Sequence, residues 1–155
     1  MVFAGVSASG ITPLFFVEKT ARIDKNVYLE ILKNHLLPWA TERYENGDWI
    51  LQQDGTPANR AESTQDWCLA NLPDFISASE WPANSPDLNG LDFSIWAMLE
   101  QKACQKKHTS VQDLRKSMEK AWNEVSLDHV RAAVEAYLSH ICLKAIIRTK
   151  GDHIE

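Results

Sequence analysis

The chain has 155 residues, of which 45% are hydrophobic and 24% are charged, and these proportions are typical of one globular domain. Six glycines, six prolines and the lack of any repeated period exclude collagen-like, linker-like and solenoid chains. No apolar run approaches the ~18 residues that cross a bilayer, and the first residues lack the features of a secretion signal. We therefore expect a protein that neither spans a membrane nor is secreted.

Charge is distributed unevenly along the sequence. Sixteen basic and 21 acidic residues give a net charge of −5. Residues 1–92 hold six basic and 13 acidic side chains, whereas residues 93–155 hold ten and eight. An acidic segment repels polyphosphate unless metal ions or a separate basic module intervene. The charge distribution thus argues against DNA binding by this chain alone.

The three cysteines, Cys68, Cys104 and Cys142, are widely spaced and form no C-x-x-C pair. Free cysteine usually behaves as a small core residue, so we predict three reduced, mostly buried thiols. No histidine pair lies at ligand spacing near them, and we therefore predict no Cys/His zinc site.

The first quarter of the chain has the pattern of a hairpin followed by a helix. Residues 1–7 and 12–17 are rich in β-forming side chains and are separated by a short turn signal, which predicts two paired strands. From Lys25 to about Tyr44, apolar residues recur at helical spacing, with Asp24 as the N-cap. Pro38 should kink this helix or divide it in two.

The middle of the chain alternates short strands with a helix. Residues 49–53 lie between turn signals and predict a short strand that ends at Asp54. Residues 75–77 are a candidate for a further short strand, and the proline-rich residues 80–89 predict an irregular loop. Between them we predict one helix over residues 57–72, with proline in its first turn and one face formed by Ala61, Thr64, Cys68 and Leu72.

Three helices are predicted in the remainder of the chain. The first begins at about Leu91 with Asp92 on its inward stripe, the second begins at a capping box that starts with Ser110, and the third covers residues 127–148. The apolar seam of the third is either core or a contact for a partner helix. This element order predicts an α/β domain with a mixed sheet and a helical tail, as a single domain over residues 1–155.

Two carboxylates stand out among the acidic residues. Asp54 follows an apolar strand, where open α/β sheets place their ligand crevices, and Asp92 lies on the inward face of a helix. Together they could bind Mg²⁺, which proteins hold through one or two carboxylates plus water and phosphate oxygens. Alternatively, Asp54 only caps the next helix and Asp92 only interacts with the positive end of its own helix.

The residues around these carboxylates form two blocks, QQDGTPAN over residues 52–59 and WPANSPDLNGLDFSIW over residues 81–96. The blocks resemble the two hallmark motifs of mariner-type transposases, and the resemblance extends over the whole chain. It implies a ribonuclease H-like fold in which three carboxylates hold two divalent metals, Mg²⁺ or Mn²⁺. Asp54 matches the second carboxylate and Asp92 the third, with 37 residues between them, which resembles the branch with that longer spacing.

By this resemblance, the function is cut-and-paste DNA transposition, in which metal-dependent strand cleavage and transfer take place at transposon ends. DNA is then the partner, a homodimer or synaptic complex is the expected assembly of the full-length form, and the nucleus is the expected location. Gln52 and Gln53 would either position the strand and the substrate or be hydrogen-bonded core residues.

The chain departs from the family pattern at its beginning and within the motifs. The family's first Asp lies on a central strand before the hairpin, and no residue before Met1 supplies it. We therefore expect an N-terminally truncated catalytic domain that also lacks the helix-turn-helix DNA-binding region and is inactive alone. Asn59 stands where the family often has His, which suggests a decaying copy. The alternative is a non-catalytic domesticated or relic module whose helices over residues 91–148 bind partner subunits.

Overall fold

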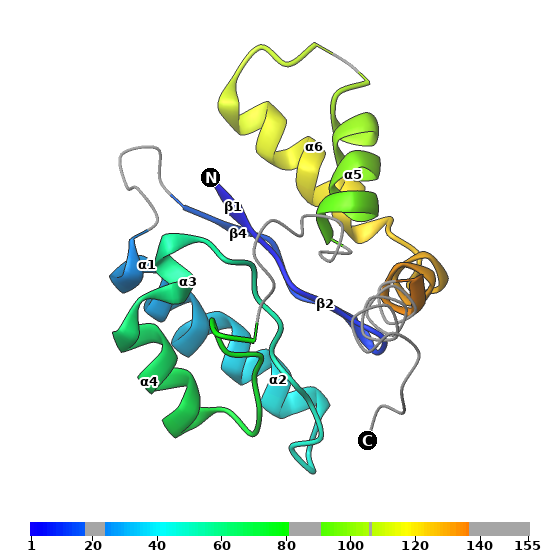
Figure 1. The fold of residues 1–155 in the computed structure, drawn as a ribbon. Helices are drawn as coiled ribbons and strands as arrows, with labels where there is room; N and C mark the ends of the chain where they lie inside the picture. Colours follow the sequence, from blue (N-terminus) through cyan, green and yellow to red (C-terminus); the bar gives the residue numbers. More distant parts are fainter. Residues whose placement is uncertain (18–23, 81–90, 106, 137–155) are drawn as a thin grey trace, which may run out of the picture. The chain divides into compact units, whose positions relative to one another are not determined.

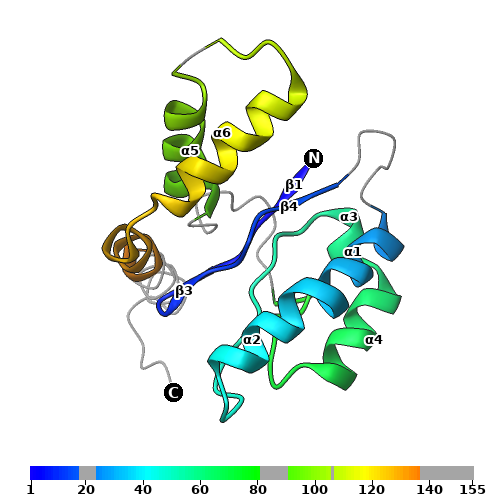
Figure 2. The same cartoon turned by 180° about the vertical axis from the view of Figure 1, so that it is seen from behind.

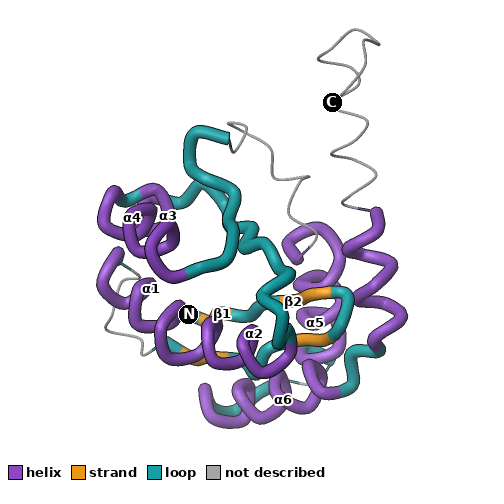
Figure 3. The backbone as a smooth tube through the Cα atoms, turned by 90° about the horizontal axis from the view of Figure 1, so that it is seen from below, coloured by secondary structure: helices purple, strands orange, loops and turns teal. Residues whose placement is uncertain are grey.

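The computed structural model describes residues 1–17, 24–80, 91–105 and 107–136. Within them, short strands precede a series of helices (Figures 1 and 3), which are β1 (Val2–Phe3), β2 (Val6–Ser7), β3 (Gly10–Ile11), β4 (Phe15–Phe16), α1 (Lys25–Ile31), η1 (Leu32–Leu36), α2 (Leu37–Arg43), α3 (Pro57–Arg60), α4 (Glu62–Asn71), η3 (Leu91–Ile95), α5 (Trp96–Ala103) and α6 (Val111–Asn123). Residues 127–136 form a further helical segment. In the described part of the chain, every helix is too short or too polar to span a membrane.

The chain divides into two compact units. Unit 1 consists of residues 1–5 and 12–84, and unit 2 consists of residues 6–11 and 85–155. The expectation of one domain over residues 1–155 stays a prediction, and each unit is described by itself below.

The predicted hairpin is present and contains an irregularity. In unit 1, β1 pairs with β4 in antiparallel fashion, with Val2 opposite Phe16. In unit 2, β2 pairs with β3, with Val6 opposite Ile11, so the register differs by one residue from that of β1 and β4. The strands β1, β3 and β4 can be followed in Figure 2. The extra residue lies in segment 12–14, which contains Pro13. Proline has no N–H for a ladder, and a bulge is one of the few strand positions that accept it.

The helix predicted from Lys25 is confirmed, and so is its cap. Oδ1 of Asp24 accepts hydrogen bonds from the N–H groups of Asn26 (2.9 Å) and Val27 (3.0 Å), which satisfies two donors that a helix start leaves open. This helix continues through the π-helical segment η1 into α2.

Pro38 is accommodated without a break in the helix. In η1, the backbone N–H of Leu37 bonds to the carbonyl of Leu32, five residues earlier. A proline ring would clash with the carbonyl four residues before it in a regular α-helix, and the wider π-turn relieves that clash. The predicted kink or division at Pro38 is therefore replaced by a local widening before it.

The prediction of a single helix over residues 57–72 is wrong. The backbone of Ala61 is not helical (ψ 134°), and this residue separates α3 from α4. Two side chains of α4 satisfy carbonyls that α3 leaves open at its end. Thr64 Oγ1 donates to the Ala58 carbonyl (2.9 Å), and Gln65 Nε2 donates to the Asn59 carbonyl (2.8 Å). These bonds compensate for the helical bonds that the break removes.

The two short strands predicted for the middle of the chain meet in one parallel bridge between Leu51 and Phe75. The N–H of Leu51 donates to the carbonyl of Asp74 (3.1 Å), and the N–H of Ile76 donates to the carbonyl of Leu51 (2.9 Å). The places of both strands are thus confirmed, but each is reduced to a single paired residue.

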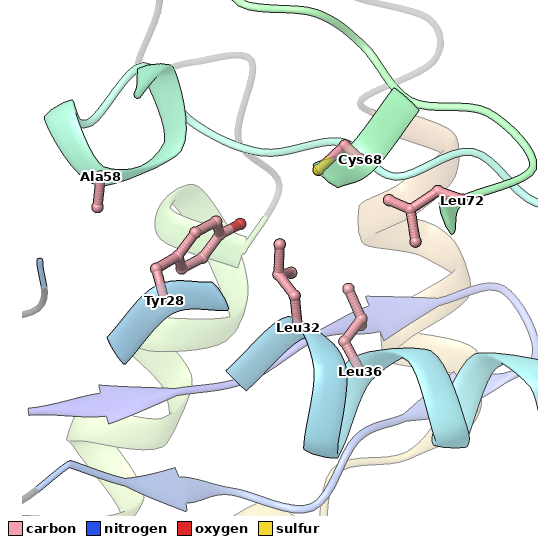
Figure 4. Packing of buried hydrophobic residues seen from close by; sticks show 6 residues of the cluster. All are labelled: Tyr28, Leu32, Leu36, Ala58, Cys68 and Leu72. Carbon is pink, nitrogen blue, oxygen red and sulfur yellow. The ribbon is translucent and has the colours of Figure 1, made fainter. Parts of the chain in front are cut away.

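The core of unit 1 lies between the first helix and the α3–α4 pair (Figure 4). Three residues of α1 and η1 at four-residue spacing occupy one face, since positions i and i+4 lie on the same side of a helix. They face three residues from α3, α4 and the end of α4, and the buried cluster is Tyr28, Leu32, Leu36, Ala58, Cys68 and Leu72.

Unit 2 has a separate core, where α5 packs against α6. The rings of Trp96 and Trp122 stack with their centroids 6.1 Å apart, and Val130 of the segment 127–136 is fully buried. The described part of the seam predicted for the last helix thus contributes to the core at Val130. The predicted capping of α6 is also confirmed, because Ser110 Oγ accepts from the N–H of Asp113 (3.1 Å).

We expect Leu32→Ala to lower the free energy of unfolding by about 2–5 kcal/mol, because it removes a fully buried side chain and leaves a cavity. The matched control is Leu69→Ala, at a leucine that is 77% exposed, which should change stability by less than about 0.5 kcal/mol. Urea unfolding followed by circular dichroism measures both variants. Equal losses would contradict the packing described for Leu32.

Candidate functional site

The segment before Asp54 is attached to the core of unit 1 through a buried tyrosine. The hydroxyl of Tyr28 on α1 donates to Oε1 of Gln53 at 2.8 Å. Burial, with smaller contributions from Cys68 and Asp54, raises the pKa of the Tyr28 phenol far above its ordinary value. The phenol therefore remains protonated and acts as the donor, which fixes the residue next to Asp54.

The carboxylate of Asp54 is held through one of its two oxygens. Oδ1 accepts hydrogen bonds from the side-chain amide of Asn59 (2.5 Å) and from the N–H of Thr56 (3.2 Å). The same Asn59 amide also donates to the main-chain carbonyl of Asp54 (3.2 Å). Among the described residues, none donates a hydrogen bond to Oδ2. The N-cap of α3 is Thr56, so Asp54 orders the loop before the helix but is not its N-cap residue.

A small recess lies beside this carboxylate, with a volume of about 10 Å³, which is room for about one water molecule. Its wall includes Gln65, which donates to the carbonyl of Asn59 (2.8 Å) and accepts from the N–H of Ala78 (2.9 Å). The recess is lined by Gln53, Asp54, Gly55, Asn59, Arg60, Gln65, Ile76, Ser77 and Ala78.

The donor set at Asp54 suits a divalent cation that keeps most of its water. Mg²⁺ and similar ions bind proteins through one or two carboxylate oxygens, and water supplies the other ligands. A half-buried carboxylate with one oxygen outside its hydrogen bonds, next to a water-sized recess, meets this requirement. In the described part of the chain, His, Cys, Asp and Glu side chains form no group of three or more that could hold a metal. Asp54 can therefore serve as one ligand and needs others.

The second predicted carboxylate, Asp92, lies on η3 in unit 2, and its side chain is outside what the structure describes. The helix predicted to begin at Leu91 is confirmed, although its first turn is π-helical. Ser94 Oγ lies 3.2 Å from Nε2 of His129, which ties η3 to segment 127–136. The predicted loop over residues 80–89 is outside the described residues except for its first. That Asp54 and Asp92 share one site stays a prediction.

Of the two glutamines before Asp54, Gln53 bonds through Oε1 to the core residue Tyr28, which agrees with the alternative of a hydrogen-bonded core residue. Its amide Nε2, in contrast, is buried and has no hydrogen-bond partner among the described residues. The prediction from sequence missed Tyr28, Asn59 and Gln65 as parts of this site, although the sequence contains a signal for the first two. Tyr28 is a polar group on an apolar helix face, and Asn59 follows Asp54 by five residues across a Gly-Thr-Pro turn.

Sequence comparison relates the chain to transposases of nematodes. No known family model matches it. The transposable element Tcb1 transposase of Caenorhabditis briggsae is 28% identical over 151 residues, which are 97% of this chain and 52% of that protein. The transposable element Tc3 transposase of Caenorhabditis elegans is 26% identical over 137 residues, which are 87% of this chain and 40% of that protein. The chain thus spans about half the length of these relatives, or less.

Comparison with solved structures relates the fold to a mariner transposase. The crystal structure of the Mos1 mariner transposase catalytic domain aligns with a TM-score of 0.75 at 16% identity, over 99% of this chain and 76% of that one. A Mos1 paired-end complex with the left transposon end aligns with a TM-score of 0.77 at 15% identity, over 99% and 45% of the two chains. This likeness concerns the fold, and it confirms the mixed α/β class predicted above.

The cysteines differ in burial, which corrects one expectation. Cys68 is buried, as predicted, but Cys104 is exposed, so the prediction of a buried thiol is wrong for Cys104. Cys142 lies outside the described residues. Burial raises the pKa of the Cys68 thiol to about 11, which keeps it protonated at neutral pH.

We therefore expect iodoacetamide at pH 8 to alkylate Cys104 at least about ten times faster than Cys68, because the thiolate is the reacting form. Alkylation of Cys68 should accelerate as the pH rises toward 11. Peptide mapping by mass spectrometry measures each site, and the urea-unfolded chain is the control in which both cysteines should react at similar rates. Equal rates in the folded chain at pH 8 would contradict the burial of Cys68.

Proposed function

We propose that this relative of the Tc1/mariner transposases carries part of the DNA-cleaving site of a cut-and-paste transposase. The observation that carries the proposal is the carboxylate of Asp54, which is held through Oδ1 after the bridged segment, while its Oδ2 accepts no hydrogen bond from the described residues. It occupies this place in a chain that matches the fold of a transposase catalytic domain over 99% of its length.

The residues proposed to bind divalent metal are Asp54 and Asp92. Mos1 catalytic-domain structures have been solved with Mg and with Mn, and the oxygen ligands proposed here suit either ion. Two such ions, when bound, supply an activated water or 3′-hydroxyl and stabilise the leaving oxygen of a DNA phosphodiester. The proposed task of both aspartates is to place their oxygens for these ions.

We further propose that the 155 residues alone do not cleave DNA. The resemblance assigns a first carboxylate and a helix-turn-helix DNA-binding region to sequence before the hairpin, and neither has a match within these residues. The excess of acidic residues in segment 1–92 supports this proposal, because an acidic segment needs metal ions or a basic module to approach DNA.

The proposed partner is transposon-end DNA, bound by two or more copies of the complete protein. Support comes from the Mos1 structures of paired-end complexes, one of which holds the left transposon end. Because the substrate of such an enzyme is chromosomal DNA, we propose the nucleus as the place of action.

We expect Asp54→Ala and Asp92→Ala each to lower DNA cleavage by about 10³-fold or more in a chain extended upstream to include the first carboxylate. The reason is that each change removes a ligand of ions that contribute several kcal/mol to the transition state. The assay is Mn²⁺-dependent cleavage of a supercoiled plasmid that carries the transposon ends.

The matched controls are Asp66→Ala and Asp128→Ala, which remove exposed aspartates from unit 1 and unit 2. Both should cleave at the parent rate, and the 155-residue chain should not cleave. Full activity of either Asp54→Ala or Asp92→Ala would defeat the assignment. If the extended chain itself does not cleave, the non-catalytic interaction module becomes the better description.

A further inference from the structure

We propose that Asn59 is a positioning residue for Asp54. Its side-chain amide fixes the carboxylate so that Oδ2 is the oxygen presented to a divalent cation. The inference rests on the proposed function for the identity of the cation, but its geometric argument comes from hydrogen bonds within unit 1.

The Asn59 amide restrains both the side chain and the backbone of Asp54. Nδ2 donates to Oδ1 at 2.5 Å and to the main-chain carbonyl at 3.2 Å. The N–H of Thr56 adds a second donor to Oδ1. Rotation of the carboxylate would break both bonds to Oδ1, and hydrogen bonds to an ionised group are stronger than those between neutral groups. The arrangement therefore favours one rotamer, in which Oδ2 lies outside the hydrogen bonds of the described residues.

Asn59 is itself held from two sides. The residue is 7% exposed, and its N–H donates to the carbonyl of Thr56 (3.1 Å). Its carbonyl accepts from Gln65, whose Oε1 accepts from the N–H of Ala78. Asn59 is thus held by Gln65 of α4, which is itself held by the segment that follows the bridge, and Asn59 in turn holds Asp54.

A ligand that is fixed before the cation arrives loses less conformational entropy on binding. Groups that orient a metal ligand through a hydrogen bond commonly contribute about 10–100-fold to metal affinity. Asn59 suits this task because its neutral N–H orients the carboxylate without cancelling the negative charge that attracts the cation. A histidine N–H could perform the same task, which makes Asn59→His a test of the donor and not of the amide.

The experiment is a Mn²⁺ titration of the 155-residue chain, in which electron paramagnetic resonance measures free Mn²⁺ and a thermal melt is recorded for each variant. Asp54→Asn should remove the Asp54-dependent site. Asn59→Ala should weaken that site by about 10-fold or more, while Asn59→His should stay within about threefold of the parent affinity. The matched control is Asn71→Ala, because Asn71 donates its side-chain amide to the Trp67 carbonyl (2.8 Å) and to no carboxylate of the described residues.

Each outcome decides the proposal. If a folded Asn59→Ala variant binds Mn²⁺ with the affinity of the parent chain, the positioning role of Asn59 is overturned. If Asp54→Asn still loses the site in that case, Asp54 remains a metal ligand. If the parent chain has no Mn²⁺ site that depends on Asp54, the proposal that Asn59 prearranges this ligand is overturned. The proposed function is judged separately, by cleavage in the extended chain. Should Asn59→Ala fail to fold, Gln65→Ala decides, because it removes the support of Asn59 and should weaken Mn²⁺ binding at least about threefold. Unchanged affinity in that variant refutes the proposal.

Discussion

The requirement that a buried phenol has a hydrogen-bond partner organises the candidate site. Tyr28 lies in the core of unit 1, and its hydroxyl bonds to Gln53, which anchors the residue before Asp54 to that core. An unpaired hydroxyl there would cost about 1–3 kcal/mol, so the folded core and the position of Asp54 are energetically coupled. A change in packing around Tyr28 would therefore reach Asp54 without any contact with its carboxylate.

Local chemistry explains which elements could be predicted from the sequence. The caps at Asp24 and Ser110 involve side chains and N–H groups two or three residues apart, and such short-range bonds depend little on the remainder of the fold. The break at Ala61 could not be read in this way, because Thr64 and Gln65 must first be in place to satisfy the carbonyls that it leaves open. Similarly, the sequence shows that Pro38 disturbs a helix but does not choose between a break, a kink and a π-turn.

The candidate site could be predicted only in part, because only some of its features depend on residues that are close in the sequence. Asp54 could be placed by its position after an apolar segment between turn signals, and its surrounding motif suggested a metal ligand. The contribution of Asn59 was hidden, since a departure from a family motif suggests decay when only residue names are compared. In three dimensions its amide reaches both oxygens of Asp54 that matter for orientation, Oδ1 and the main-chain carbonyl. The hydrogen-bonding capacity at that position is therefore the property to compare among relatives.

The division of the hairpin between the two units has a consequence for how the chain can be cut and synthesised. Residues 6–11 group with residues 85–155, while the chain on either side of them belongs to unit 1. The backbone therefore passes between the units three times, and a protease must cut in more than one place to release either unit. No contiguous fragment contains all of unit 2 and none of unit 1. During synthesis, the strand pair β2–β3 is made long before the helices of its own unit, so unit 2 can be completed only after the intervening chain has emerged.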